Sequence, residues 1–219
     1  MKDNLTDITF VLDRSGSMSV VRDDTIGGFN TFLNEQKNAQ GEAQLTLIQF
    51  DDHYDIVYTA QNVKVVAELD ATTFVPRGWT ALLDAIGRTI NDTGARIGAM
   101  QEADRPSKVI FVILTDGAEN ASKEFTREKI NEMIKHQTET YNWDFVFLGA
   151  NQDAISVGSG LGISAGNSMT YAANAQGTND AFMSVASSMV SYRTGDMSKK
   201  SMFFEDSDRK KQEDAGATA

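Results

Sequence analysis

One stretch near the N-terminus carries the strongest indication of the fold, and it reads Thr6-Asp7-Ile8-Thr9-Phe10-Val11-Leu12-Asp13-Arg14-Ser15-Gly16-Ser17. Its first half is apolar at consecutive rather than alternate positions, a pattern typical of a central strand covered by helices on both faces. The apolar run stops at Asp13, and polar residues follow. We therefore expect a buried strand over residues 6–12 that leads directly into a polar loop.

The rest of the chain alternates between segments typical of strands and of helices. Strands are expected over residues 43–50, 54–60, 108–114, 143–148 and 168–171, and helices over residues 24–37, 81–101, 125–137, 151–160 and 179–193. The short connection Asp51-Asp52-His53 indicates an antiparallel hairpin at one edge of the sheet. Regular alternation favours a doubly wound α/β sheet, in which functional residues lie at the carboxyl ends of the strands.

The length permits one core rather than two. The chain has 219 residues, of which 41% are apolar and 9% aromatic, so whole-chain disorder is excluded. From Gly195 onward the periodicity is lost, and we predict a folded domain over residues 1–194 and a mixed-charge, disordered tail over residues 195–219. The apolar triplet Met202-Phe203-Phe204 could dock on a surface, but disorder of the tail is the favoured interpretation.

The composition excludes several functions. The formal net charge is -11, and most of it belongs to residues 1–194, so nucleic acid is not an expected partner. The chain has no cysteine, which excludes disulfides, thiolate metal sites and cysteine nucleophiles. Its first residues lack the apolar core of a signal peptide, and no apolar run is long enough to cross a bilayer. We expect a cytoplasmic protein without a membrane partner.

Oxygen-bearing side chains follow two of the predicted strands. Asp13, Ser15 and Ser17 lie at alternate positions of the loop after the first strand, and Asp116 follows the strand at residues 108–114. Thr80 offers another hydroxyl in a loop just before a helix. Hard oxygen ligands of this kind suit Mg²⁺ or Mn²⁺ and not a soft metal. If the two strands are neighbours, the sequence predicts a divalent cation site between their loops.

These motifs resemble the von Willebrand factor A domain family with its metal-ion-dependent adhesion site. The resemblance covers about residues 5–194, and the Asp-x-Ser-x-Ser, Thr and Thr-Asp-Gly motifs match all five metal positions, which are Asp13, Ser15, Ser17, Thr80 and Asp116. Ser-Gly-Ser-Met at residues 15–18 is similar to the intracellular bacterial and phage branch. The resemblance implies a three-layer, mostly parallel sheet with strand order 3-2-1-4-5-6 and an antiparallel third strand.

The resemblance also implies a function. Mg²⁺, for which Mn²⁺ or Ca²⁺ could substitute, would bind Ser15, Ser17 and one carboxylate directly, while Asp13 or Thr80 acts through water. An open coordination position would receive an Asp or Glu from a partner protein, without catalysis. Residues expected at the partner-binding rim are Arg14, Met18, Arg77, Trp79 and Glu119, because arginine, tryptophan and methionine are enriched in interfaces.

Alternative functions remain open at this point. The chain could be an assembly component of a phage particle or a stress-resistance system, or an accessory subunit of an AAA+ ATPase, since it has no P-loop of its own. A haloacid dehalogenase-type hydrolase would need an Asp at position 15, and a serine hydrolase would need a Gly-x-Ser-x-Gly motif. We therefore do not expect an enzyme. No residue pattern indicates the partner or the oligomeric state.

Overall fold

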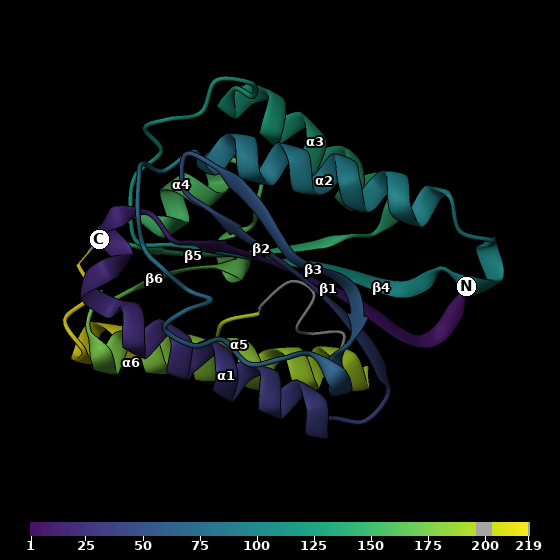
Figure 1. The fold of residues 1–219 in the computed structure, drawn as a ribbon, viewed down its shortest axis with the longest axis horizontal. Helices are drawn as coiled ribbons and strands as arrows, with labels where there is room; N and C mark the ends of the chain where they lie inside the picture. The colour runs from purple at the N-terminus through teal and green to yellow at the C-terminus, as the bar shows by residue number, and fades with distance from the viewer. Residues whose placement is uncertain (196–202, 219) are drawn as a thin grey trace.

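The computed structural model describes residues 1–195 and 203–218, in which one six-stranded sheet lies between two layers of helices (Figure 1). The strand order is β3-β2-β1-β4-β5-β6. β3 runs antiparallel to β2, and the other neighbouring strands are parallel. The predicted fold class, strand order and direction of the third strand are confirmed.

The strands and helices follow one another almost as the sequence predicts. The strands are β1 (Lys2–Asp13), β2 (Glu42–Phe50), β3 (Tyr54–Asn62), β4 (Pro106–Thr115), β5 (Asp144–Ala150) and β6 (Ser168–Tyr171). The helices are α1 (Arg22–Asn38), α2 (Leu82–Gly98), α3 (Arg127–Tyr141), α4 (Ala154–Gly160), α5 (Ala175–Thr194) and α6 (Asp206–Asp214). Short 3-10 turns cover Gly16–Val21, Val63–Val65, Glu102–Asp104 and Ala165–Asn167.

Each central strand buries side chains on both faces, which explains the consecutive apolar residues in its sequence. In β1, Phe10 points into the core shared with α1 and α5, whereas Val11 points into the core shared with α2 and α3. Phe10 stacks on Phe182 of α5 with 5.9 Å between ring centroids. Figure 1 shows α1, α5 and α6 on one face of the sheet and α2, α3 and α4 on the other. The carboxyl ends of the five parallel strands therefore meet at one edge, between the layers.

The C-terminal segment differs from its prediction. Residues 203–218 are ordered against the domain, and they include the helix α6. Phe203 and Phe204 are each 1% exposed and belong to the core on the α1 side of the sheet. The predicted disorder is therefore wrong for this part of the tail, because two buried aromatic rings anchor it. Residues 196–202, including Met202 of the apolar triplet, lie outside the described part of the chain.

Side chains of α6 bind the edge strand β6 and the residues beside it. Gln212 is 1% exposed, accepts a hydrogen bond from the backbone N–H of Ala172 (3.1 Å) and donates one to the carbonyl of Gly177 (3.0 Å). Arg209 donates to the carbonyl of Ser168 over 2.8 Å. The folded unit thus extends past the boundary at residue 194 that the sequence predicts.

Across residues 1–195 and 203–218, no helix combines the length and the apolar character that crossing a lipid bilayer requires.

Candidate metal centre

Two loops of the predicted cation site meet because β1 and β4 are neighbouring parallel strands. Leu12 of β1 lies opposite Leu114 of β4, so both chains leave the sheet at the same edge. The hydroxyl of Ser17 donates to Asp116 Oδ1 over 2.5 Å. The hydroxyls of Ser15 and Ser17 are 3.1 Å apart. Ser15, Ser17 and Asp116 therefore present a continuous row of oxygens across the two loops.

Thr80 joins this group from the loop before α2. Its backbone N–H donates to the side-chain carbonyl of Asn120 over 2.9 Å, and its own carbonyl accepts from the N–H of Asn120 over 3.0 Å. A Cβ atom built on Gly117 would lie 3.3 Å from the Thr80 hydroxyl and 3.4 Å from the Ser17 hydroxyl. Gly117 thus leaves room between the two hydroxyls, and Asn120 fixes the loop that carries Thr80.

Asp13 occupies the floor of the site. Its Oδ1 accepts from the backbone N–H of Ser15 over 2.6 Å, and its Oδ2 accepts from the hydroxyl of Thr115 over 2.5 Å. Burial raises the pKa of Asp13 to about 7, although the hydrogen bonds from Thr115 and Ser15 oppose the shift. Burial also raises the pKa of Asp116, against the hydrogen bond from Ser17. Two desolvated carboxylates side by side form a site that a cation would stabilise.

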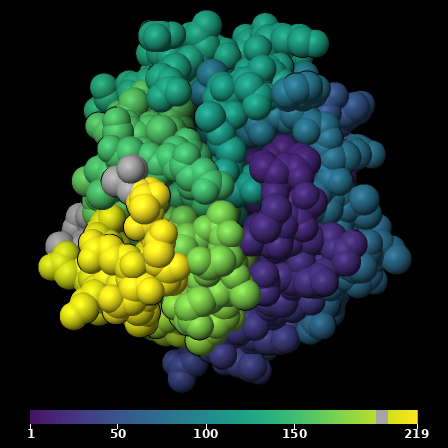
Figure 2. Space-filling model, turned by 90° about the vertical axis from the view of Figure 1, so that its left-hand side faces the viewer, coloured from purple at the N-terminus to yellow at the C-terminus, as the bar shows by residue number. Residues whose placement is uncertain are grey.

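The candidate metal centre is buried on its Asp13 side and open to solvent on its Ser17 side. Asp13, Ser15, Thr80 and Asp116 are each no more than 3% exposed, whereas Ser17 is exposed. Figure 2 views the molecule from this end and shows the purple segment after β1 at the surface. A cation bound between these oxygens would be reached from solvent on the Ser17 side, where a partner could approach.

The donor set fits a hard divalent cation. Two carboxylates and three hydroxyls are oxygen ligands of the kind that Mg²⁺ prefers. Because both Asp13 oxygens already accept hydrogen bonds, its carboxylate is the ligand best placed to act through water. The hydroxyl of Tyr171, at the end of β6, is wholly buried without a hydrogen-bond partner among the described residues. Burial, with a further contribution from the charges of Asp116 and Asp13, raises the pKa of Tyr171, so this orphaned hydroxyl lies within electrostatic reach of the site.

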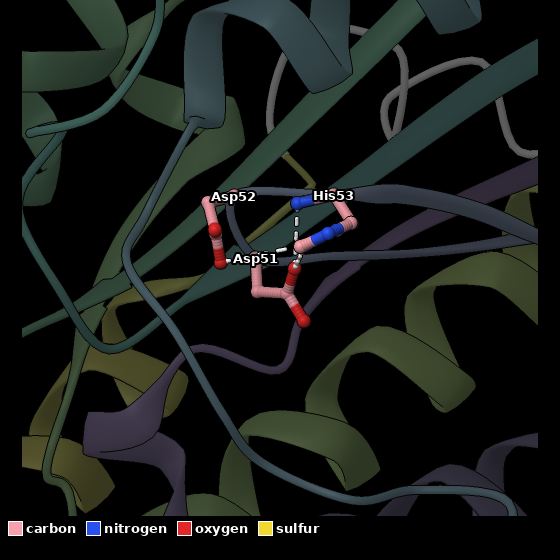
Figure 3. A group of neighbouring side chains, drawn as sticks. All are labelled: Asp51, Asp52 and His53. Atoms are coloured by element: carbon pink, nitrogen blue, oxygen red, sulfur yellow. Dashed lines mark hydrogen bonds and ion pairs between the residues drawn. The ribbon is translucent and has the colours of Figure 1, made fainter.

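A second group of ligand-type side chains lies in the turn between β2 and β3. One ligand atom each from Asp51, Asp52 and His53 lies within 4.8 Å of the others, a spacing that a metal ion could bridge (Figure 3). Asp51 Oδ1 accepts from the backbone N–H of His53 over 2.6 Å and lies 3.2 Å from its Nδ1. The side chain of His53 is 65% exposed.

Arginine side chains already neutralise this second group. Asp51 is 0% exposed, and its Oδ2 accepts from Arg14 Nε over 3.0 Å and from Arg77 Nε over 2.8 Å. Asp55 also accepts from the guanidinium of Arg14. A cation at Asp51 would face two guanidinium groups, whereas no arginine among residues 1–195 and 203–218 is observed in contact with Asp13 or Asp116. The Asp13 and Asp116 site is therefore the better cation site of the two.

Backbone hydrogen bonds beside these ion pairs position the metal-site loops. Arg77 donates its backbone N–H to the carbonyl of Arg14 over 2.8 Å, and Ala81 donates to the carbonyl of Asp51 over 3.0 Å. The loop at residues 76–81, which contains Thr80, is therefore held on both sides. Asp51 is buried although it lies in a hairpin turn, a position at which an acidic side chain is usually exposed. Asp13 was predicted as a site residue because it is a polar residue at the carboxyl end of a parallel strand. Asp51 follows β2 in the same way, so the same pattern could have indicated it.

Two of the five predicted rim residues, Arg14 and Met18, are buried, and Glu119 is half-buried. Met18 is 0% exposed and belongs to the apolar core, and Arg14 is 8% exposed within the ion pairs of Asp51. Glu119 accepts hydrogen bonds at both carboxylate oxygens, because it caps the first turn of α2 and its own loop. Trp79 and Arg77 do lie at the surface, with Trp79 68% exposed.

One structural contact was missed entirely by the sequence analysis. Asp84 in the first turn of α2 accepts from the backbone N–H groups of Lys123, Glu124 and Phe125 at 2.8–2.9 Å. Together with Glu119 it ties the start of α2 to the loop that follows Asp116. These partners lie 36 to 41 residues apart in the chain, so no local pattern could have revealed them.

The similarities to known proteins agree with this geometry. Residues 7–157 match the family model of the von Willebrand factor type A domain. No curated protein matches the chain.

Several solved structures share the fold. Proximal thread matrix protein 1 from the mussel byssus, in a structure with a zinc-occupied MIDAS motif, is 15% identical, with a TM-score of 0.58 over 86% of this chain and 46% of that chain. The pilus adhesin SpaC from Lactobacillus rhamnosus GG is 15% identical, with a TM-score of 0.60 over 88% of this chain and 30% of that chain. A von Willebrand factor type A protein from Catenulispora acidiphila is 13% identical, with a TM-score of 0.53 over 86% and 43%.

This chain therefore spans less than half the length of each of these three proteins. The family model matches more than half of the chain, and the strand order and the arrangement of helices agree with it. The chain belongs to the von Willebrand factor type A domain family.

Proposed function

We propose that this chain is a non-enzymatic, metal-dependent protein-binding module. A divalent cation held by Asp13, Ser15, Ser17, Thr80 and Asp116 accepts a carboxylate from an Asp or Glu of a partner protein. The observation that carries the proposal is the 2.5 Å contact between the Ser17 hydroxyl and Asp116, which unites the two loops at a solvent-facing position. The cation is Mg²⁺, and Mn²⁺ or Ca²⁺ can take its place, because all the donors are hard oxygens.

The charge of the chain gives the cation a specific role. With a formal net charge of -11, the chain by itself repels an acidic partner. A bound divalent cation reverses the sign of the local potential and supplies an electrophilic point for the carboxylate. The protein contributes the rigid floor, in which Thr115 and Ser15 orient Asp13 and Asn120 orients Thr80.

The comparisons support a binding role. Domains of this family commonly mediate protein–protein interactions. One similar structure has a zinc-occupied MIDAS motif, and another is a pilus adhesin.

The proposal is tested by capture of partners from the source cell. Wild-type protein with Mg²⁺ is compared with wild type in a chelator, with Asp116→Asn and with Asp52→Asn as the matched control. We expect partners that are retained by wild type and by Asp52→Asn but are lost with the chelator and with Asp116→Asn. Identical sets of captured proteins in all four samples would contradict metal-dependent recognition. Sedimentation with and without Mg²⁺ separates a partner complex from self-assembly.

Trp79 gives a prediction about the contact surface. Its ring is 68% exposed, and it directly precedes the candidate ligand Thr80. Exposed tryptophan side chains often dominate the energy of an interface, so we expect Trp79→Ala to weaken binding of a captured partner by about 2 kcal/mol or more. Mg²⁺ affinity, measured by calorimetry, should stay nearly unchanged. An equal loss of both affinities would show that Trp79 supports the metal site instead.

A further inference from the structure

A hollow of about 590 Å³ lies at the end of the sheet opposite the candidate metal centre. It is lined by residues of α2, α3 and the start of β4, including Gly94, Pro106 and Gln137. β4 begins at Pro106 beside this hollow and ends just before Asp116, so the length of the strand separates it from the cation site. Its volume is in the range of small-molecule binding sites, roughly 300–1,000 Å³.

The floor of the hollow is apolar and aromatic. Trp143, which precedes β5, is 5% exposed and stacks on Phe111 with 5.5 Å between ring centroids and 17° between the planes. Gly94 of α2 faces this ring, because a Cβ atom built there would lie 3.9 Å from the Trp143 Cη2 atom. Ile90 and Val109 complete the floor. The absence of a side chain at Gly94 therefore leaves space directly beside a fixed aromatic ring.

The charge of the lining contrasts with that of the whole molecule. Although the chain contains 31 acidic residues, no Asp or Glu is among the described residues that line the hollow. Arg105 and His136 line it instead. In a protein with a net charge of -11, such a surface is locally favourable to an anion.

Arg105 is held in place without a carboxylate partner. Its Nε donates to the carbonyl of Met100 over 3.2 Å, and its Nη2 donates to the carbonyl of Gly98 over 3.1 Å. Nearby arginines of α2 differ, since Arg88 pairs with Glu124 and Arg96 pairs with Asp7. Within the described residues, Arg105 forms no ion pair. The two carbonyls fix its guanidinium and leave Nη1 free to bind a ligand.

We propose that this hollow binds a small aromatic carboxylate, with the ring beside Trp143 and Gly94 and the carboxylate on Arg105. A guanidinium group binds a carboxylate through charge-assisted hydrogen bonds and is well suited to a partly desolvated site. The amide of Gln137 offers a further polar contact. This site is independent of the cation and of the proposed partner-binding surface.

The experiment uses 2-naphthoate as the probe and the neutral 2-naphthamide as its matched analogue. Binding to the full chain is measured by calorimetry. The position of the bound probe is found from the NMR resonances of the indole N–H groups of the two tryptophans. We expect saturable binding of 2-naphthoate about tenfold tighter than that of 2-naphthamide, as a charge-assisted contact predicts. Only the Trp143 resonance should shift, and Trp79→Phe assigns the two signals.

Variants separate the ring contact from the charge contact. Gly94→Leu should prevent binding of both probes, and Arg105→Gln, which removes the guanidinium charge and keeps a polar side chain, should remove the preference for the carboxylate. Arg22→Gln at the other end of the molecule serves as the control and should bind like wild type. If Gly94→Leu does not fold, Arg105→Gln still decides the outcome. The proposal is overturned by equal affinity for the two probes, by no saturable binding, or by a shift of Trp79 alone.

Discussion

At the scale of single residues, Asp13 links the fold to the candidate chemistry. Its side chain ends the central strand β1, is 0% exposed, and accepts hydrogen bonds from the loop of Ser15 and from Thr115 of β4. The strand sequence therefore determines where this carboxylate lies, and the neighbouring strand determines its orientation. The cost of burying it raises its pKa to about 7.

That pKa predicts how Mg²⁺ binding depends on pH. Because the pKa of Asp13 is raised in the folded state, its protonated carboxyl group favours folding. Its contribution to the free energy of unfolding is complete below the unfolded pKa of 3.8 and is lost as pH rises through about 7. Bound Mg²⁺ needs the ionised carboxylate and restores this stability. We expect the increase in melting temperature caused by Mg²⁺ to be small near pH 5.5 and to grow up to about pH 8.

Thermal unfolding in matched buffers with and without Mg²⁺ checks this dependence. Asp13→Asn cannot be ionised at this position, so its Mg²⁺ response should be smaller and should change less between the two pH values than that of wild type. The same Mg²⁺ effect at both pH values in wild type would contradict the link to Asp13.

At the scale of elements, the packing of α1 on α5 depends on one glycine. A Cβ atom built on Gly28 would lie 2.3 Å from the ring of Phe182, whereas a Cβ atom on the adjacent Gly27 would meet nothing within 4 Å. The two residues lie side by side in the same helix, so they form a matched pair.

We therefore predict opposite effects from two alanine substitutions. Gly27→Ala should stabilise the protein by about 0.5–1 kcal/mol, because alanine is the better helix former. Gly28→Ala should destabilise it by about 1–3 kcal/mol, because Phe182 must move within a packed core. The free energies of unfolding in urea measure both. A stabilising Gly28→Ala would contradict the close approach of α1 and α5.

Most elements could be predicted from sequence because their apolar residues repeat with a clear period. β4 and β5 are continuous apolar runs, and α2 carries an apolar stripe. α6 could not be found this way, since Asp206–Asp214 contains no apolar residue and is held by Gln212 and Arg209. Asp13, Ser15, Ser17 and Asp116 could be predicted as candidate ligands because they lie at or just after strand ends, whereas Thr80, in the loop before α2, was indicated by the family resemblance. The ion pairs of Arg14 could not, because Asp51 and Asp55 lie 37 and 41 residues away.

At the scale of the whole molecule, the C-terminal segment completes the α1 side of the core. Phe203 is 1% exposed, its backbone N–H donates to Asn167, and its carbonyl accepts from Ser188. The segment also binds the edge strand β6 through α6. Residues beyond the family match thus contribute to the stability of the domain.

Phe203→Ala should accordingly destabilise the whole domain by about 3–5 kcal/mol, the cost of removing a buried aromatic ring. Lys210→Ala, at an exposed position of α6, is the control and should change stability by less than about 0.5 kcal/mol. Urea unfolding measures both variants. Wild-type stability in Phe203→Ala would mean that the segment does not pack on the domain.

We propose that Asp13, Ser15, Ser17, Thr80 and Asp116 form a single divalent cation site, and calorimetric titration with Mg²⁺ measures its occupancy. We expect saturable binding of one Mg²⁺ per chain by wild type and by Asp52→Asn. We expect no measurable binding by Asp116→Asn, whose fold is checked by circular dichroism. Unchanged Mg²⁺ binding by a folded Asp116→Asn, or its loss in Asp52→Asn alone, would contradict this assignment and place the cation at the Asp51–His53 turn.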